Sequence, residues 1–222
     1  MSELLIELFS EEIPARMQRK AAADFKELLL SSFKEAGLDV EAAQAFWTPR
    51  RLAFLITGLP EKTKDVREER KGPKEGAPEK ALEGFLRGAG LTSLDQAELR
   101  ETGKGKAYFA VIEKPGKASK DLLPDLITTA ISKLVWPKSM RWARNTHRWV
   151  RPLHSVLAIL DGETLEGSYE GIVFGNVTEG HRFMAPGTFT VTSFQNYQQE
   201  LKNRFVILDP EERKSKVEQA SK

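Results

Sequence analysis

Cationic side chains collect in one interval of the sequence that contains no acidic residue. Between Asp125 and Asp161 there is no Asp or Glu, whereas six Lys and Arg residues occur there. The four arginines recur at spacings of three, four and three residues, so a helical backbone would align their guanidinium groups on one face, where they could bind phosphates. The interval therefore predicts a strongly positive surface, with cations at Lys133, Lys138, Arg141, Arg144, Arg148 and Arg151.

Three tryptophans, Trp136, Trp142 and Trp149, interleave with these arginines. An aromatic ring beside arginines can stack on a nucleotide base, or it can anchor the segment in the core. In the second case the arginines would pair with carboxylates elsewhere in the fold. Charge spacing alone leaves both interpretations open.

A second cationic pair, Arg50 and Arg51, follows a Thr-Pro turn at the start of an apolar run. This position suits the presentation of positive charge to a phosphate. A structural salt bridge to Glu11 or Glu12 explains the pair equally well. We therefore keep both arginines as candidate binding residues with two open roles.

The histidines offer no metal chemistry. None of His147, His154 and His181 has a partner at a metal-binding spacing such as His-Glu-x-x-His. His181 and Arg182 follow a glycine, where they could bind a phosphate or hold a turn by hydrogen bonds, and the structural role is favoured. We expect no metal site, and keep His181 and Arg182 as binding candidates.

Motifs for independent catalysis are missing. The glycines at 103–106 lack the Ser or Thr that a phosphate-binding loop requires, and those at 84–90 lack the dinucleotide-binding spacing. There is no cysteine and no Gly-x-Ser-x-Gly nucleophile elbow. We therefore predict no catalytic residue and no cofactor site in this chain.

Composition indicates a soluble, cytoplasmic protein with no membrane segment. The chain has 222 residues, 40% of them hydrophobic, which is enough to form a core without disulfides. Glu3 and Glu7 interrupt the first apolar run, which argues against a signal peptide. The net charge of +2 does not by itself require a nucleic-acid partner.

Helices alternate with short strands, which predicts an α+β fold with mixed, mainly antiparallel sheets and packed helices in two lobes. The first lobe is expected at 1–120, with an exposed charged arm near 61–80, and the second at 121–222. The last helix has little apolar face, which predicts truncation at the C-terminus. Strands are predicted at 4–9, 52–59, 153–160, 164–166, 170–174, 188–191 and 205–208, helices at 14–36, 81–89, 122–135 and 194–203, and a hairpin around 103–106.

Short blocks along nearly the whole chain resemble the bacterial glycyl-tRNA synthetase β subunit family. Pro-Lys-Ser-Met-Arg-Trp at 137–142 and Trp-Val-Arg-Pro-Leu-His at 149–154 resemble a signature pair of that family. The sequence departs from the usual pattern of that family at 9–10, at 74–75 and at 143–148; in the last of these segments the expected glycine is missing. Further colinear matches lie at 4–8, 11–15, 48–53, 71–73, 84–85 and 178–183.

The resemblance implies a division of labour between two subunits. It implies that an α subunit carries the class II catalytic motifs, ATP and magnesium, and charges tRNA with glycine. The β subunit is implied to handle glycine tRNA and assembly in an α and β hetero-oligomer, a heterotetramer. HD-like and anticodon-binding regions are implied to lie beyond this N-terminal part, which would be inactive alone. The alternative is a scaffold that never touches RNA.

Overall fold

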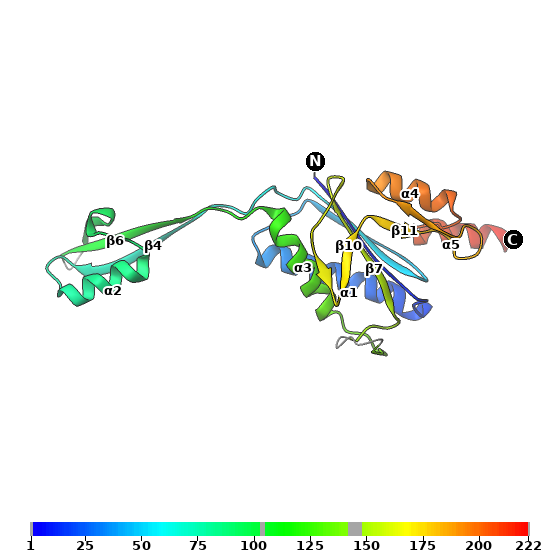
Figure 1. The fold of residues 1–222 in the computed structure, drawn as a ribbon, viewed down its shortest axis with the longest axis horizontal. Coiled ribbons are helices and arrows are strands. Elements are labelled where there is room, and N and C mark those ends of the chain that lie inside the picture. Colours follow the sequence, from blue (N-terminus) through cyan, green and yellow to red (C-terminus); the bar gives the residue numbers. More distant parts are fainter. Residues whose placement is uncertain (1, 103–104, 142–147, 222) are drawn as a thin grey trace. The chain divides into compact units, whose positions relative to one another are not determined.

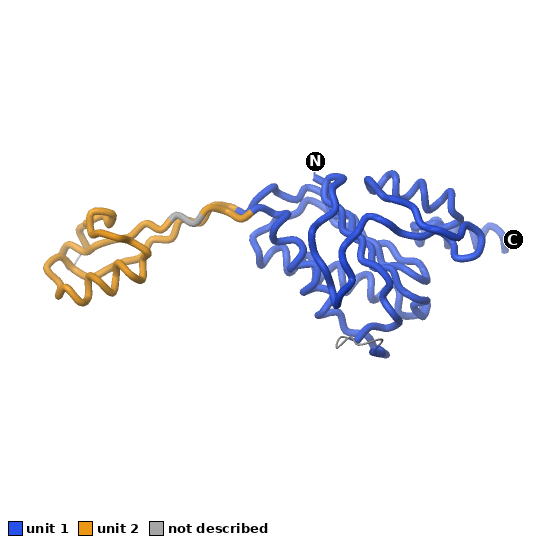
Figure 2. The backbone as a smooth tube through the Cα atoms, viewed as in Figure 1, with its two compact units in different colours: residues 1–63, 118–222 blue, residues 64–117 orange. Residues whose placement is uncertain are grey.

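The computed structural model describes residues 2–102, 105–141 and 148–221, and it confirms the α+β class. The chain forms two compact units, residues 1–63 with 118–222 (unit 1) and residues 64–117 (unit 2), as Figure 2 shows. These units differ from the expected lobes 1–120 and 121–222. The reason is that β7 (Leu153–Leu160) hydrogen bonds to β1 (Glu3–Ser10) within one sheet, so the two ends of the chain share unit 1.

The main sheet of unit 1 has the order β2-β3-β1-β7-β10-β9, with β8 also paired to β7. Neighbouring strands are antiparallel except for β7 and β10. The strands predicted at 4–9, 52–59 and 153–160 are confirmed as β1, β3 and β7. The remaining strands of this sheet are β2 (Ala42–Thr48), β3 (Arg51–Thr57), β8 (Glu163–Thr164), β9 (Ser168–Tyr169) and β10 (Ile172–Gly175).

Helices α1 (Ala15–Glu35) and α3 (Ser119–Lys133) cover one face of this sheet (Figure 1). Because successive strand residues point to opposite faces, Leu4, Ile6 and Leu8 of β1 pack into the core beneath these helices. Leu5 instead belongs to the core on the other face. Burial on both faces explains why β1 is apolar almost throughout.

The other face carries β11 (Val177–Glu179), β12 (Thr188–Thr190), α4 (Phe194–Asn203) and α5 (Pro210–Ala220). The strand predicted at 205–208 is wrong, because this segment closes the C-terminus of α4. Phe205 has a φ of 61°, and the Val206 N–H donates to the Leu201 carbonyl at 2.8 Å. Asp209 is the N-cap of α5, as its sequence indicates, and accepts from the Glu211 N–H at 2.8 Å.

Unit 2 is a three-stranded antiparallel sheet in the order β4-β6-β5, packed on one helix. The exposed arm expected at 61–80 is corrected in part, because β4 pairs along β6 although most of its residues are exposed. The predicted hairpin is confirmed as β5 and β6. The elements are β4 (Val66–Lys74), α2 (Glu79–Ala89), a short 3-10 helix (Leu94–Gln96), β5 (Glu98–Thr102) and β6 (Gly105–Lys114).

A glycine makes room for the small core of unit 2. Phe85 and Ala89 of α2 pack against Ala110 of β6. A Cβ at Gly72 would lie 2.6 Å from Cε2 of the Phe85 ring, far inside van der Waals contact. The Lys-Gly-Pro block at 71–73 therefore has a packing reason.

Candidate nucleic-acid and partner-binding surfaces

Two tryptophans anchor the segment that joins α3 to β7. Trp136 and Trp149 are 7% and 1% exposed, and their rings meet edge to face with centroids 5.0 Å apart. Such buried rings serve the core and are not open stacking platforms. Trp142 lies outside the described residues.

Backbone pairing closes the base of this segment. The Met140 N–H donates to the Trp149 carbonyl at 2.8 Å, and the Trp149 N–H donates to the Met140 carbonyl at 3.1 Å. Residues paired in this antiparallel way cannot belong to one continuous helix, so the expected helical alignment of the arginines is wrong in the described part of the segment. We call the described residues 138–141 and 148–151 the basic loop; Arg144 lies outside the described residues.

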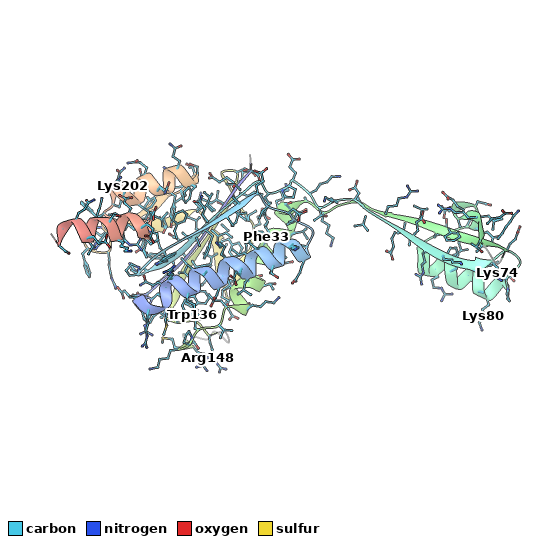
Figure 3. All side chains as sticks on the ribbon, turned by 180° about the vertical axis from the view of Figure 1, so that it is seen from behind. Phe33, Lys74, Lys80, Trp136, Arg148 and Lys202 are labelled. Atoms are coloured by element: carbon cyan, nitrogen blue, oxygen red, sulfur yellow. The ribbon has the colours of Figure 1, made fainter. Side chains whose placement is uncertain are left out.

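The described cations of the basic loop are exposed and carry uncompensated charge. Within the described part of the chain, none of them forms an ion pair. Arg148 donates to the Ser139 hydroxyl at 3.1 Å and to its carbonyl at 3.2 Å, which fixes the guanidinium at the base of the loop (Figure 3). These acceptors are neutral, so they do not compensate the positive charge of Arg148. The same holds for Arg151, which donates to the Val150 carbonyl. The exposed cations of the basic loop are Lys138, Arg141, Arg148 and Arg151.

Arg50 and Arg51 are engaged in internal contacts. The Arg51 side chain is 2% exposed, with Nε 3.3 Å from a Glu7 carboxylate oxygen and Nη2 donating to the Glu179 carbonyl at 2.8 Å. Arg50 is 15% exposed and lies 3.6 Å from the Glu179 carboxylate. Both guanidinium groups also lie over the Phe9 ring. The salt-bridge interpretation thus describes their geometry, although the partners are not Glu11 or Glu12.

A buried network surrounds Glu7, which sequence reasoning missed. The carboxylate is 0% exposed and accepts hydrogen bonds from the hydroxyls of Thr178 and Tyr197 in addition to its ion pair. Burial, together with the Glu7 charge, raises the pKa of Tyr197 well above its usual value. The sequence signal that could have predicted this network is the single Glu inside the apolar run of β1, because a buried charge requires partners.

His181 and Arg182 also have internal partners. Nδ1 of His181 accepts from the backbone N–H groups of Phe183 and Met184 at 3.3 and 3.2 Å, so this ring holds a turn. Arg182 lies 3.3 Å from Glu11 and 3.6 Å from Glu12. The hydrogen bond from His154, followed by the charges of Arg182 and Arg50, lowers the pKa of Glu11 against the opposing effect of its burial.

The structure brings Arg50, Arg51, His181 and Arg182 around one cavity of about 270 Å³. The aromatic ring of Phe183, 81% exposed, also lines it. The nine predicted binding residues therefore fall into two sets. Those at this cavity have internal contact partners, and those described on the basic loop have no acidic partner; Arg144 lies outside the described residues. Among the nine predicted binding residues, the described arginines without an acidic partner are those of the basic loop.

The described residues contain no cluster of three or more His, Asp or Glu placed to hold a metal ion. No helix among them is both long and apolar enough to cross a membrane.

Comparison with known proteins gives a consistent result. A family model described as the glycyl-tRNA synthetase beta subunit matches residues 4–222. The chain is 52% identical over 241 residues to a glycine–tRNA ligase beta subunit of Rhodospirillum centenum, covering 98% of this chain and 34% of that relative. It is 53% identical over 223 residues to that of a Ruegeria species, covering 98% and 32%. The chain thus spans about a third of the length of these curated relatives.

Proposed function

The chain belongs to the family of glycyl-tRNA synthetase β subunits, and from this membership we propose that it forms the N-terminal region of such a subunit. In this proposal it contributes tRNA contact and subunit assembly and is inactive alone, while the α subunit binds ATP and magnesium and attaches glycine to tRNA. The two subunits form a hetero-oligomer in the cytoplasm.

The observation that carries the RNA-contact role is the uncompensated charge of the basic loop. Lys138, Arg141 and Arg148 are exposed and have no acidic partner within the described ranges. A phosphate backbone supplies the missing negative charge and releases counterions when lysines and arginines neutralise it. The anchoring tryptophans hold the base of the loop, so less ordering is required on binding.

The paired cavity supports the assembly role. Arg50, Arg51 and Arg182 at this cavity already have carboxylate partners, so binding a phosphate to them would break existing ion pairs. Exposed Phe183 and Phe205 lie at the same cavity, and aromatic residues with arginines are typical of protein interfaces. If the chain used only this cavity, and the basic loop did not bind RNA, the chain would be the scaffold without RNA contact.

Glycine charging by the assembled α and β subunits separates the two roles. When the β chain carries Lys138→Ala, Arg141→Ala and Arg148→Ala, the KM of the assembled enzyme for glycine tRNA is expected to rise about tenfold. KM for glycine and for ATP should not change, because those substrates bind elsewhere in this proposal.

The matched control removes three other exposed cations, Lys202, Lys214 and Lys216, which lie near carboxylates at 3.9, 3.9 and 3.4 Å. It changes the net charge equally and should leave KM for tRNA unchanged. An unchanged KM for tRNA in the loop variant would favour the scaffold. Charging supported by the α subunit with this 222-residue chain alone would overturn the proposed inactivity.

A further inference from the structure

An apolar hollow adjoins the basic loop on the side of α1. It has a volume of about 270 Å³, and its lining includes the side chains of Met17, Ala21 and Trp136 together with Val135. Pro137, the residue directly before Lys138, also lines it, so the hollow and the loop are continuous along the chain. Figure 3 labels Trp136 beside α1.

The rim of the hollow is cationic. Arg16 is exposed and, within the described part of the chain, has no ion pair, while Lys20 lies 2.8 Å from Asp24. These residues repeat every four positions along α1, so they share one side of the helix. The first turn of α1 contains no acidic residue. Arg16 therefore extends the uncompensated charge of the basic loop onto α1.

We propose that this hollow receives one unpaired nucleotide of the RNA whose phosphates the basic loop binds, an inference that rests on the proposed function. A duplex keeps its bases stacked inside and would need only the cations. An apolar hollow beside phosphate-binding cations instead suits an unstacked base, which proteins read in single-stranded loops and ends.

Charge favours RNA over a protein segment as the occupant. Arg16 lines the hollow and Lys138 directly follows its lining residue Pro137, and neither has an acidic partner among the described residues, whereas Lys20 of the lining is paired with Asp24. An apolar protein anchor would leave both charges uncompensated at the edge of the contact, whereas a nucleotide brings its own phosphate. The same argument separates this hollow from the paired cavity at Arg50.

Binding of two RNA probes to the 222-residue chain tests this inference. The probes are a hairpin with an unpaired loop and a blunt duplex of equal length and charge, followed by fluorescence anisotropy. Ala21→Leu fills the hollow and should weaken hairpin binding about tenfold while leaving duplex binding and the salt dependence unchanged. Ala23→Leu, on the exposed side of α1, is the matched control.

A second variant avoids any folding defect. Val135 is 82% exposed, so Val135→Ser removes an apolar wall of the hollow without disturbing the core, and should weaken hairpin binding selectively. Val173→Ser, at a strand position 73% exposed, is its control. Arg16→Ala should reduce the salt slope for the hairpin by about one, whereas Arg19→Ala, which lines a different hollow, should not.

The outcomes distinguish the two proposals. If the hollow variants leave hairpin binding intact while Arg141→Ala and Arg148→Ala weaken it, the nucleotide pocket is wrong and the proposed RNA contact stands. If no probe binds in a salt-dependent manner, both proposals fail. If Val135→Ser instead impairs assembly with the α subunit and leaves RNA binding unchanged, the occupant is protein, and the inference is overturned.

Discussion

Glu7 and Arg51 form an ion pair within the protein interior, with Nε of Arg51 3.3 Å from a carboxylate oxygen of Glu7 and side-chain exposures of 2% and 0%. Glu7 lies opposite Ala53 in the antiparallel register of β1 and β3, so Arg51 is its diagonal neighbour on the same face. The pair joins the main sheet to the second layer, because Thr178 and Tyr197 also bind Glu7.

Replacing Arg51 is therefore expected to destabilise the fold. Arg51→Met leaves the Glu7 charge buried without its cation and should lower the free energy of unfolding by about 3–5 kcal/mol. Urea denaturation followed by circular dichroism measures the change. The double variant with Glu7→Gln should recover part of the loss. An Arg51→Met chain as stable as the wild type, but weaker in RNA binding, would show that Arg51 is a binding residue.

Tyr197 predicts a specific alkaline behaviour. Burial raises its pKa well above 10, so the folded chain holds the phenol proton more tightly than the unfolded chain does. This contribution to stability is complete below about pH 10 and is lost as the pH rises above that value. Unfolding measured from pH 8 to 11 should therefore show a shallower alkaline decline for Tyr197→Phe. An identical decline would contradict the assignment.

The same substitution has a cost at neutral pH. Tyr197→Phe removes a hydroxyl donor from buried Glu7 and should reduce stability by about 1–3 kcal/mol. Tyr169, whose pKa is raised to about 12 by burial, supplies a comparison. The contribution of Tyr169 to the free energy of unfolding should disappear between about pH 10 and 12. The contact between Tyr197 and Glu7 should not be affected.

Two glycines of unit 2 should respond in opposite ways to the same substitution. Gly72→Ala places a methyl group against the Phe85 ring and should cost about 1–3 kcal/mol. Gly84→Ala lies within α2, where a Cβ meets nothing within 4 Å, and should stabilise by about 0.5–1 kcal/mol. Hydrogen exchange of the β6 amides measures both effects. Equal protection in the two variants would refute the packing role of Gly72.

The elements that sequence patterns predicted well are those whose side chains carry the signal. β1 and α1 show apolar residues at periods typical of a buried strand and an amphipathic helix. β4 was missed because charged residues, one glycine and one proline occupy eight of its nine positions, and the single apolar residue, Val66, cannot form a strand pattern. Its pairing with β6 lies in the backbone. The strand predicted at 205–208 failed because those residues close α4.

The candidate surfaces show a similar limit. Charge and spacing identified the arginines, but a sequence does not state which cation has an acidic neighbour in space. Glu179 lies 128 positions from Arg51, whose guanidinium binds its carbonyl, and no local pattern connects them. Arg16 was missed for the related reason that α1 meets the basic loop only through the fold.

The salt dependence of glycine tRNA binding tests the central claim most directly, namely that unpaired loop cations bind RNA while the paired arginines do not. A plot of the logarithm of the binding constant against that of salt concentration should lose about two units of slope in the Arg141→Ala, Arg148→Ala chain. Arg182→Ala, which removes a cation paired with Glu11, should leave the slope unchanged. A full wild-type slope in the loop variant, with a reduced slope in Arg182→Ala, would contradict this account.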